Sequence, residues 1–160
     1  MERHTEQMQE RPAPPPPTAW DDVPCPWRAA RGRLAHTRTT LDGGMTAPGA
    51  ARRAVAAAAA DLDEDLRTDL QLLVSELVSN AVVHARPAAG ERRIALDVHI
   101  SSEWVAVTVT DAGGGFDPGR LAGPRPGVPG AHGLEMVAAL SDMRGIDSRD
   151  PFRIWFARLL

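Results

Sequence analysis

Two polar residues in one predicted helix are the first candidates for chemistry. Glu76 and Asn80 are four residues apart, so a helix places both side chains on the same face. Asn80 is the only asparagine of the chain, and its amide is disfavoured inside a helix because it competes with the backbone for hydrogen bonds. A carboxylate and an amide oxygen on one face can bind a hard cation such as Mg²⁺, or orient a hydroxyl group or a water molecule. The exposed face of an amphipathic helix would show the same spacing, so the pair alone leaves both interpretations open.

Two glycine-containing segments are the next candidates. Asp111, Gly113 and Gly115 directly follow a predicted strand, where glycine lets the backbone approach a ligand closely and the aspartate can accept a hydrogen bond from a ligand N–H group. Gly130 and Gly133 open a predicted helix, whose free N–H groups and positive dipole end suit a phosphate. Taken one at a time, a plain turn and a flexible loop would explain these glycines equally well.

The composition narrows the chemistry. All 18 basic residues are arginine, which excludes a P-loop lysine, a Schiff-base lysine and the strand lysine of protein kinases. The net charge of −3 predicts no broad basic surface for direct binding of nucleic acid. Cys25 is the only cysteine, which excludes an internal disulfide and a cysteine-based metal cluster. No apolar signal core follows Met1, and the longest apolar run, 54–60, is too short to cross a membrane, so we expect a cytoplasmic protein without a membrane partner.

The helices and strands that must position these residues can be predicted from the spacing of apolar residues along the chain. Residues 1–30 are predicted to be a disordered tail, because the proline-rich run at 11–18 favours polyproline II, and residues 31–160 are predicted to form one domain. A strand is expected over 33–41. Thr46 offers an N-cap for a helix that runs to about residue 60, with Pro48 just inside its start. A longer helix over 64–85 carries an apolar stripe made of Leu66, Leu70, Leu73, Leu77 and Ala81.

The second half of the chain alternates with the period of strands. Apolar residues recur at every second position over 94–100 and over 105–109, and the short segment 101–103 between them predicts an antiparallel hairpin. A Gly/Pro-rich loop over 116–131, a helix over 132–140 and a last strand over 152–160 complete the pattern. The order predicts an α/β fold: a two-layer sandwich with a mostly antiparallel mixed sheet covered on one face by helices.

The three motifs together resemble the GHKL (Bergerat-fold) ATPase superfamily, shared by gyrase, heat-shock protein 90, histidine kinases and mismatch-repair proteins. The likeness is strongest to the histidine-kinase-like ATP-binding domain of bacterial anti-sigma factors, its serine kinase branch. The matching segments are the helix ELVSNAVVHA at 76–85, the strand and glycines VTVTDAGGG at 107–115, the glycine-opened helix GLEMVAAL at 133–140, and the pair Trp155-Phe156. The likeness covers the whole expected domain.

The resemblance implies a role for each motif residue. Asn80 would hold the Mg²⁺ that bridges the phosphates of ATP, and Glu76 would be the general base or would orient an attacking serine hydroxyl. Asp111 would bond the adenine amino group. The remaining positions would line the nucleotide or close over its phosphates: Gly113, Gly115, Gly130, His132, Gly133 and Leu134. Two positions depart from the family pattern, because His132 stands where many relatives have arginine and a threonine that often precedes the Trp-Phe pair is absent.

The resemblance also implies a function. Such a protein is an ATP-binding anti-sigma factor and serine-protein kinase, which sequesters a sigma factor and phosphorylates an anti-anti-sigma protein with a STAS domain on serine. A homodimer through the first strand and the sheet edge is implied as well. The two departures favour an alternative, a nucleotide-binding regulator of a partner-switching system without significant kinase activity. A fragment of a sensor histidine kinase is disfavoured, because residues before 33 leave no room for a phosphoacceptor hairpin.

Overall fold

The computed structural model describes residues 35–84, 92–111, 133–147 and 151–160. The predicted tail 1–30 and the whole of the predicted loop 116–131 therefore lie outside the described residues. The described elements are, in order, β1 (Ala35–Asp42), α1 (Ala47–Ala58), α2 (Glu64–His84), β2 (Arg93–Ile100), β3 (Trp104–Asp111), α4 (Gly133–Leu140), β4 (Met143–Asp147) and β5 (Phe152–Leu159).

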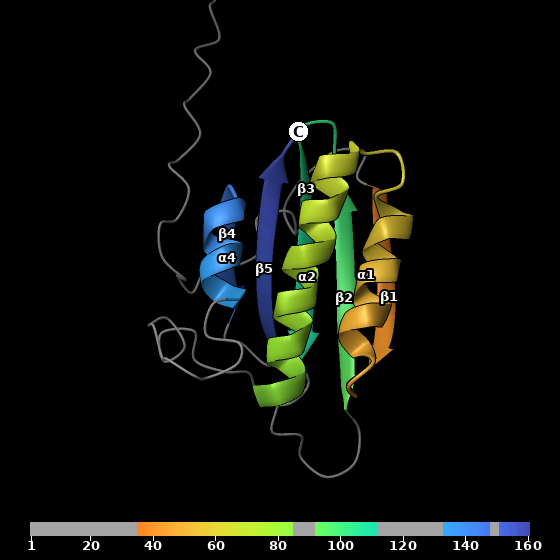
Figure 1. Cartoon of the computed structure of the whole chain (residues 1–160), viewed down its shortest axis with the longest axis vertical. Helices are drawn as coiled ribbons and strands as arrows, with labels where there is room; N and C mark the ends of the chain where they lie inside the picture. The colour runs from red at the N-terminus through yellow and green to blue at the C-terminus, as the bar shows by residue number, and fades with distance from the viewer. Residues whose placement is uncertain (1–34, 85–91, 112–132, 148–150) are drawn as a thin grey trace, which may run out of the picture.

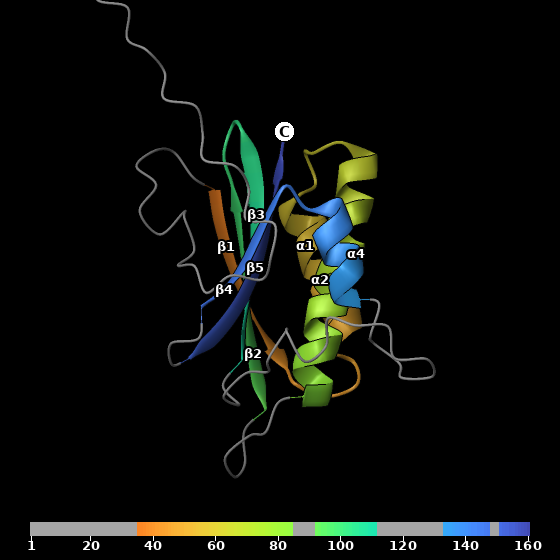
Figure 2. The same cartoon turned by 90° about the vertical axis from the view of Figure 1, so that its left-hand side faces the viewer.

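The strands form one sheet, and the described helices cover one of its faces. The strand order is β1-β2-β3-β5-β4, and each neighbouring pair is antiparallel. Figure 1 looks through the helices onto the sheet, with α1 toward β1, α2 across the centre and α4 toward β4. Figure 2 shows the same two layers from the side. The predicted two-layer sandwich is confirmed, and so is the hairpin at 101–103, which the Ser101 N–H closes by donating to the Trp104 carbonyl at 2.9 Å.

The core lies between the two layers, where the periodicities of strand and helix meet. Alternate residues of β2 and β3, including Leu96 and Val107, face the helices and are fully buried. The stripe predicted on α2 is buried against them from Leu70 to Ala81, with Leu66 at its half-buried end. Small side chains on α1 let that helix pack closely against α2.

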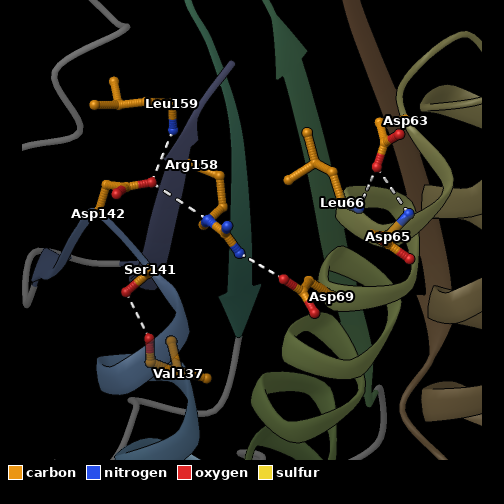
Figure 3. A network of polar contacts seen from close by, with 9 residues as sticks. All are labelled: Asp63, Asp65, Leu66, Asp69, Val137, Ser141, Asp142, Arg158 and Leu159. Atoms are coloured by element: carbon orange, nitrogen blue, oxygen red, sulfur yellow. Dashed lines mark hydrogen bonds and ion pairs between the residues drawn. The ribbon is translucent and has the colours of Figure 1, made fainter.

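The helix starts differ in how they are capped. Asp63 caps α2, because its Oδ1 accepts hydrogen bonds from the N–H groups of Asp65 at 2.9 Å and Leu66 at 3.3 Å (Figure 3). Thr46 is the N-cap residue of α1, as predicted, but its side chain makes no capping hydrogen bond. Pro48 in the first turn stabilises that start instead, because its φ is preset for a helix and it has no N–H group to leave unpaired.

The sequence prediction missed strand β4. It pairs with β5 through Gly145, which lies opposite Trp155. A Cβ atom at Gly145 would come within 2.6 Å of Trp155 Cζ2, so glycine is needed for the indole ring to lie across this strand. A five-residue segment with glycine at its centre has too little β-propensity to stand out, and its pairing partner defines it as a strand.

One arginine links three elements at the end of the sheet. Arg158 of β5 donates from Nη1 to Asp69 Oδ2 of α2 at 2.8 Å and from Nε to Asp142 Oδ2, between α4 and β4, at 3.3 Å. The same Asp142 oxygen accepts from the Leu159 N–H at 2.9 Å (Figure 3). The helical layer and the outer strands are thus fixed to each other by charge-assisted hydrogen bonds.

Among the described residues, no helix combines the length and the apolarity that crossing a bilayer requires.

Candidate functional site

Helix α2 carries the two residues on which the predicted site depends. Glu76 is half-buried and Asn80, one turn later, is only 4% exposed. The Asn80 Nδ2 atom is buried and has no hydrogen-bond partner among the described residues. A buried amide left unsatisfied costs roughly 1–3 kcal/mol, so stability alone does not explain an asparagine at this position. A buried, unsatisfied polar group points to a ligand-binding role.

The start of α4 packs directly against Glu76. A Cβ atom at Gly133 would overlap Glu76 Oε2, and it would come within 3.2 Å of Glu76 Cδ and 3.3 Å of Glu76 Cβ. Glycine therefore lets α4 begin this close to Glu76 while the carboxylate keeps its observed position. The next residue, Leu134, is 1% exposed and anchors the start of α4 in the core. The N–H groups of the first turn of α4 thus lie beside the face of α2 that carries Glu76 and Asn80.

Asp111 ends the central strand β3. It is 4% exposed and pairs with Ile94 of β2 on one side and Phe152 of β5 on the other. Because side chains alternate along the strand, Asp111 faces the helical layer, as do Val107 and Val109. Helix α2 contacts both β3 and α4. Glu76 and Asn80 of the helical layer and Asp111 of the sheet therefore face the space between the two layers, and the end of β3 lies at the same end of the molecule as the last turns of α2 (Figure 1).

The structure describes part of the predicted site. Glu76, Asn80, Asp111, Gly133 and Leu134 are described, and the contact between Glu76 and Gly133 joins two of the three motifs. The other predicted residues, Gly113, Gly115, Gly130 and His132, lie outside the described residues.

The donors on α2 fit a nucleotide carrying a hard cation. A carboxylate and an amide oxygen are ligands that Mg²⁺ accepts, and the cation usually keeps several waters and binds phosphate oxygens as well. The unsatisfied amide of Asn80 and the close approach of Gly133 to Glu76 are the two observations that favour a ligand at this place. A helix start beside that place suits phosphate.

Comparison with known proteins decides the family. The model of a histidine kinase-like ATPase domain matches residues 46–151, which is more than half of the chain and includes the whole candidate site. The chain belongs to the histidine kinase-like ATPase domain family. ATP is the nucleotide that this membership implies.

Two kinds of curated relatives share part of the sequence. An "Anti-sigma F factor" from Pasteuria penetrans is 47% identical over 69 residues, which cover 41% of this chain and 46% of the relative. A "Sensor histidine kinase PdtaS" from two strains of Mycobacterium tuberculosis is 41% identical over 59 residues, which cover 36% of this chain and 12% of the relative. The chain thus spans about half the length of the anti-sigma factor and a small part of the sensor kinase.

Proposed function

We propose that this protein binds ATP with Mg²⁺ and transfers the γ-phosphoryl group to a serine of a partner protein. The observation that carries this proposal is the arrangement on α2: Asn80 buried with an unsatisfied amide nitrogen, and Glu76 one turn before it against the start of α4. Phosphoryl transfer depends on positioning and charge neutralisation more than on covalent chemistry by the protein. A chain without lysine can supply both through an asparagine-held cation and helix N–H groups.

Each described residue has a part in this proposal. Asn80 would hold the Mg²⁺ ion, which would supply charge neutralisation at the phosphates of ATP, and Asp111 would accept a hydrogen bond from the adenine amino group. Glu76 orients the partner's serine hydroxyl and takes its proton as the serine oxygen bonds to the γ-phosphorus. The bond from that phosphorus to the bridging oxygen breaks, and ADP leaves. Gly133 keeps the start of α4 close enough for its N–H groups to face the phosphates.

The proposed partners follow from one relative and from the resemblance. The likeness to an anti-sigma F factor supports a sigma factor as the protein that is sequestered. The serine that receives the phosphoryl group would belong to an anti-anti-sigma protein with a STAS domain, which competes for the sigma factor. Phosphorylation adds negative charge to the competitor and so changes its binding to the kinase.

The test is transfer from ATP with Mg²⁺ to candidate anti-anti-sigma proteins of the same genome, followed by mass spectrometry. Glu76→Gln keeps the size of the side chain and removes the base, so we expect transfer to fall by roughly 10²–10⁴-fold while the Kd for ATP changes little. Glu103→Gln is the matched control, because Glu103 lies in the exposed turn between β2 and β3. Normal transfer by Glu76→Gln would show that the base assignment is wrong.

Two other outcomes would replace the proposal. Binding of ATP with Mg²⁺ but no transfer to any candidate partner would favour the nucleotide-binding regulator without kinase activity. Phosphate that appears on the protein itself and is lost in acid would indicate phosphohistidine, the chemistry that the name of the sensor kinase relative suggests, whereas phosphoserine survives acid.

A further inference from the structure

Three metal-ligand side chains gather on strands β1 and β2, away from the nucleotide site. His36 lies on β1 and is directly paired with His99 of β2, while Asp97 is two residues before His99. Residues two apart on a strand share a face, and cross-strand partners do as well. Their neighbours Leu96 and Val98 point into the core, so the three side chains lie on the face opposite the helices.

The three side chains are close enough to share an ion. His36 Nε2 is 2.7 Å from Asp97 Oδ1, and the rings of His36 and His99 stack with centroids 4.4 Å apart and planes 2° from parallel. One ligand atom from each of the three residues lies within 4.8 Å of the others. Ligand atoms of a tetrahedral zinc site, each about 2.0–2.2 Å from the metal, are roughly 3.3–3.5 Å apart. His36 Nε2 and Asp97 Oδ1 are closer than that, so binding of an ion would require the His36 side chain to rotate.

The surroundings of the cluster allow such a rotation. His36 has a side chain that is 45% exposed on an edge strand, whereas Asp97 is 11% exposed and is held in place. The Arg38 guanidinium is 3.7 Å from Asp97 Oδ1, but it is 61% exposed and can turn into solvent.

We propose that His36, Asp97 and His99 bind a zinc ion on the face of the sheet opposite the helices. Two imidazole nitrogens and one carboxylate oxygen form a donor set that suits Zn²⁺, whereas Mg²⁺ and Ca²⁺ select sites made of oxygen. Three protein ligands leave a fourth tetrahedral position for water or another ligand. The site is separate from the nucleotide, since Glu76 and Asn80 belong to the helical layer on the other face (Figure 2).

The test is a zinc titration of the full-length protein by calorimetry, without nucleotide because ATP would chelate the metal. We expect one zinc ion per chain, and binding at least about tenfold weaker in His36→Ala and in His99→Ala. Millimolar Mg²⁺ should not compete. His84→Ala, at the end of α2, is the matched control and should bind as the unchanged protein does. Circular dichroism of each variant checks that it is folded.

A conservative variant separates the metal site from a structural hydrogen bond. His36→Gln can still donate to Asp97, so it should keep the melting temperature of the zinc-free protein and still lose zinc affinity. Equal zinc affinity in the unchanged protein and in the double variant His36→Ala/His99→Ala would overturn the proposal, because the ion would then be bound elsewhere. Absence of zinc binding at micromolar concentration, or displacement by Mg²⁺, would overturn it too.

Discussion

The buried amide of Asn80 lowers the stability of the fold, and its proposed role in binding a ligand explains why an asparagine stands there. Its buried Nδ2 atom has no partner among the described residues, although a leucine or an alanine at this place in α2 would pack without that cost. The sequence alone marked this residue, because the only asparagine of the chain stands where helix propensity disfavours it. That Asn80 and Glu76 share a face was also predictable, because both belong to one continuous helix and residues four apart lie on the same side of a helix.

Contacts between distant residues were not predictable in this way. Gly133 and Glu76 meet only because α4 packs against α2, and the His36–Asp97 pair depends on the register of β1 on β2. Periodicity places a residue on a face of its own element, but it does not specify which residue of another element lies opposite. The cluster of His36, Asp97 and His99 could therefore not be predicted from the sequence, which shows only that Asp97 and His99 are two residues apart on one predicted strand.

The substitution Gly133→Ala adds a single methyl group, and we expect it to lower activity while leaving stability nearly unchanged. In Gly133→Ala the new Cβ displaces the flexible carboxylate end of Glu76, which costs little stability but moves the proposed base. We expect phosphate transfer to fall at least tenfold, as about 1.4 kcal/mol of lost transition-state stabilisation would produce, while the melting temperature stays nearly unchanged. Gly49→Ala in α1 is the control, because the nearest atoms there are 3.7 Å from the added Cβ. Unaltered transfer in Gly133→Ala would show that the Glu76 contact does not matter for activity.

The elements themselves were predictable where their periodicity was long. The stripe on α2 and the alternation on β2 and β3 identify these elements, and the apolar residues that carry the two patterns are buried or half-buried in the core. Strand β4 was missed because five residues around Gly145 give too short a pattern, and its identity comes from pairing with β5. The position of β5 between β3 and β4 could not be predicted without that strand.

The junction of α2, β5 and the segment between α4 and β4 should depend on Arg158. Its side chain is 24% exposed and its partners Asp69 and Asp142 are 34% and 44% exposed, so solvent screens each pair. We expect Arg158→Gln to lower the free energy of unfolding by about 1 kcal/mol, and by less at high salt. Urea denaturation of the double variant with Asp69→Asn should show that the two changes are not additive. Additive effects would mean that the pair seen in Figure 3 contributes nothing measurable.

At the scale of the whole molecule, the two proposed sites lie on opposite faces of the sheet. The proposed nucleotide site lies on the side of the helical layer, and the proposed zinc site lies on β1 and β2, on the face opposite the helices. The fold class was predictable because the order of elements and the three family motifs agree with each other. Self-association through the edge strand β1 and the domain boundary at residue 31 stay predictions.

Binding of ATP with Mg²⁺ should stabilise the entire domain, since the proposed site joins α2, β3 and α4. At a free ATP concentration of 100 times Kd, linkage adds about 2.7 kcal/mol to the free energy of unfolding, or roughly 5–10 °C in Tm.

Asn80→Ala should change the free energy of unfolding of the nucleotide-free protein by less than about 1 kcal/mol, because it removes a buried amide nitrogen that has no partner among the described residues. The same variant should lose most of the rise in Tm with ATP and Mg²⁺, and the unchanged protein should lose it in EDTA. Scanning calorimetry measures Tm for each protein in each of these conditions. If Tm rose equally for both proteins, or if EDTA left the rise intact, the proposal that Asn80 holds the cation would be wrong.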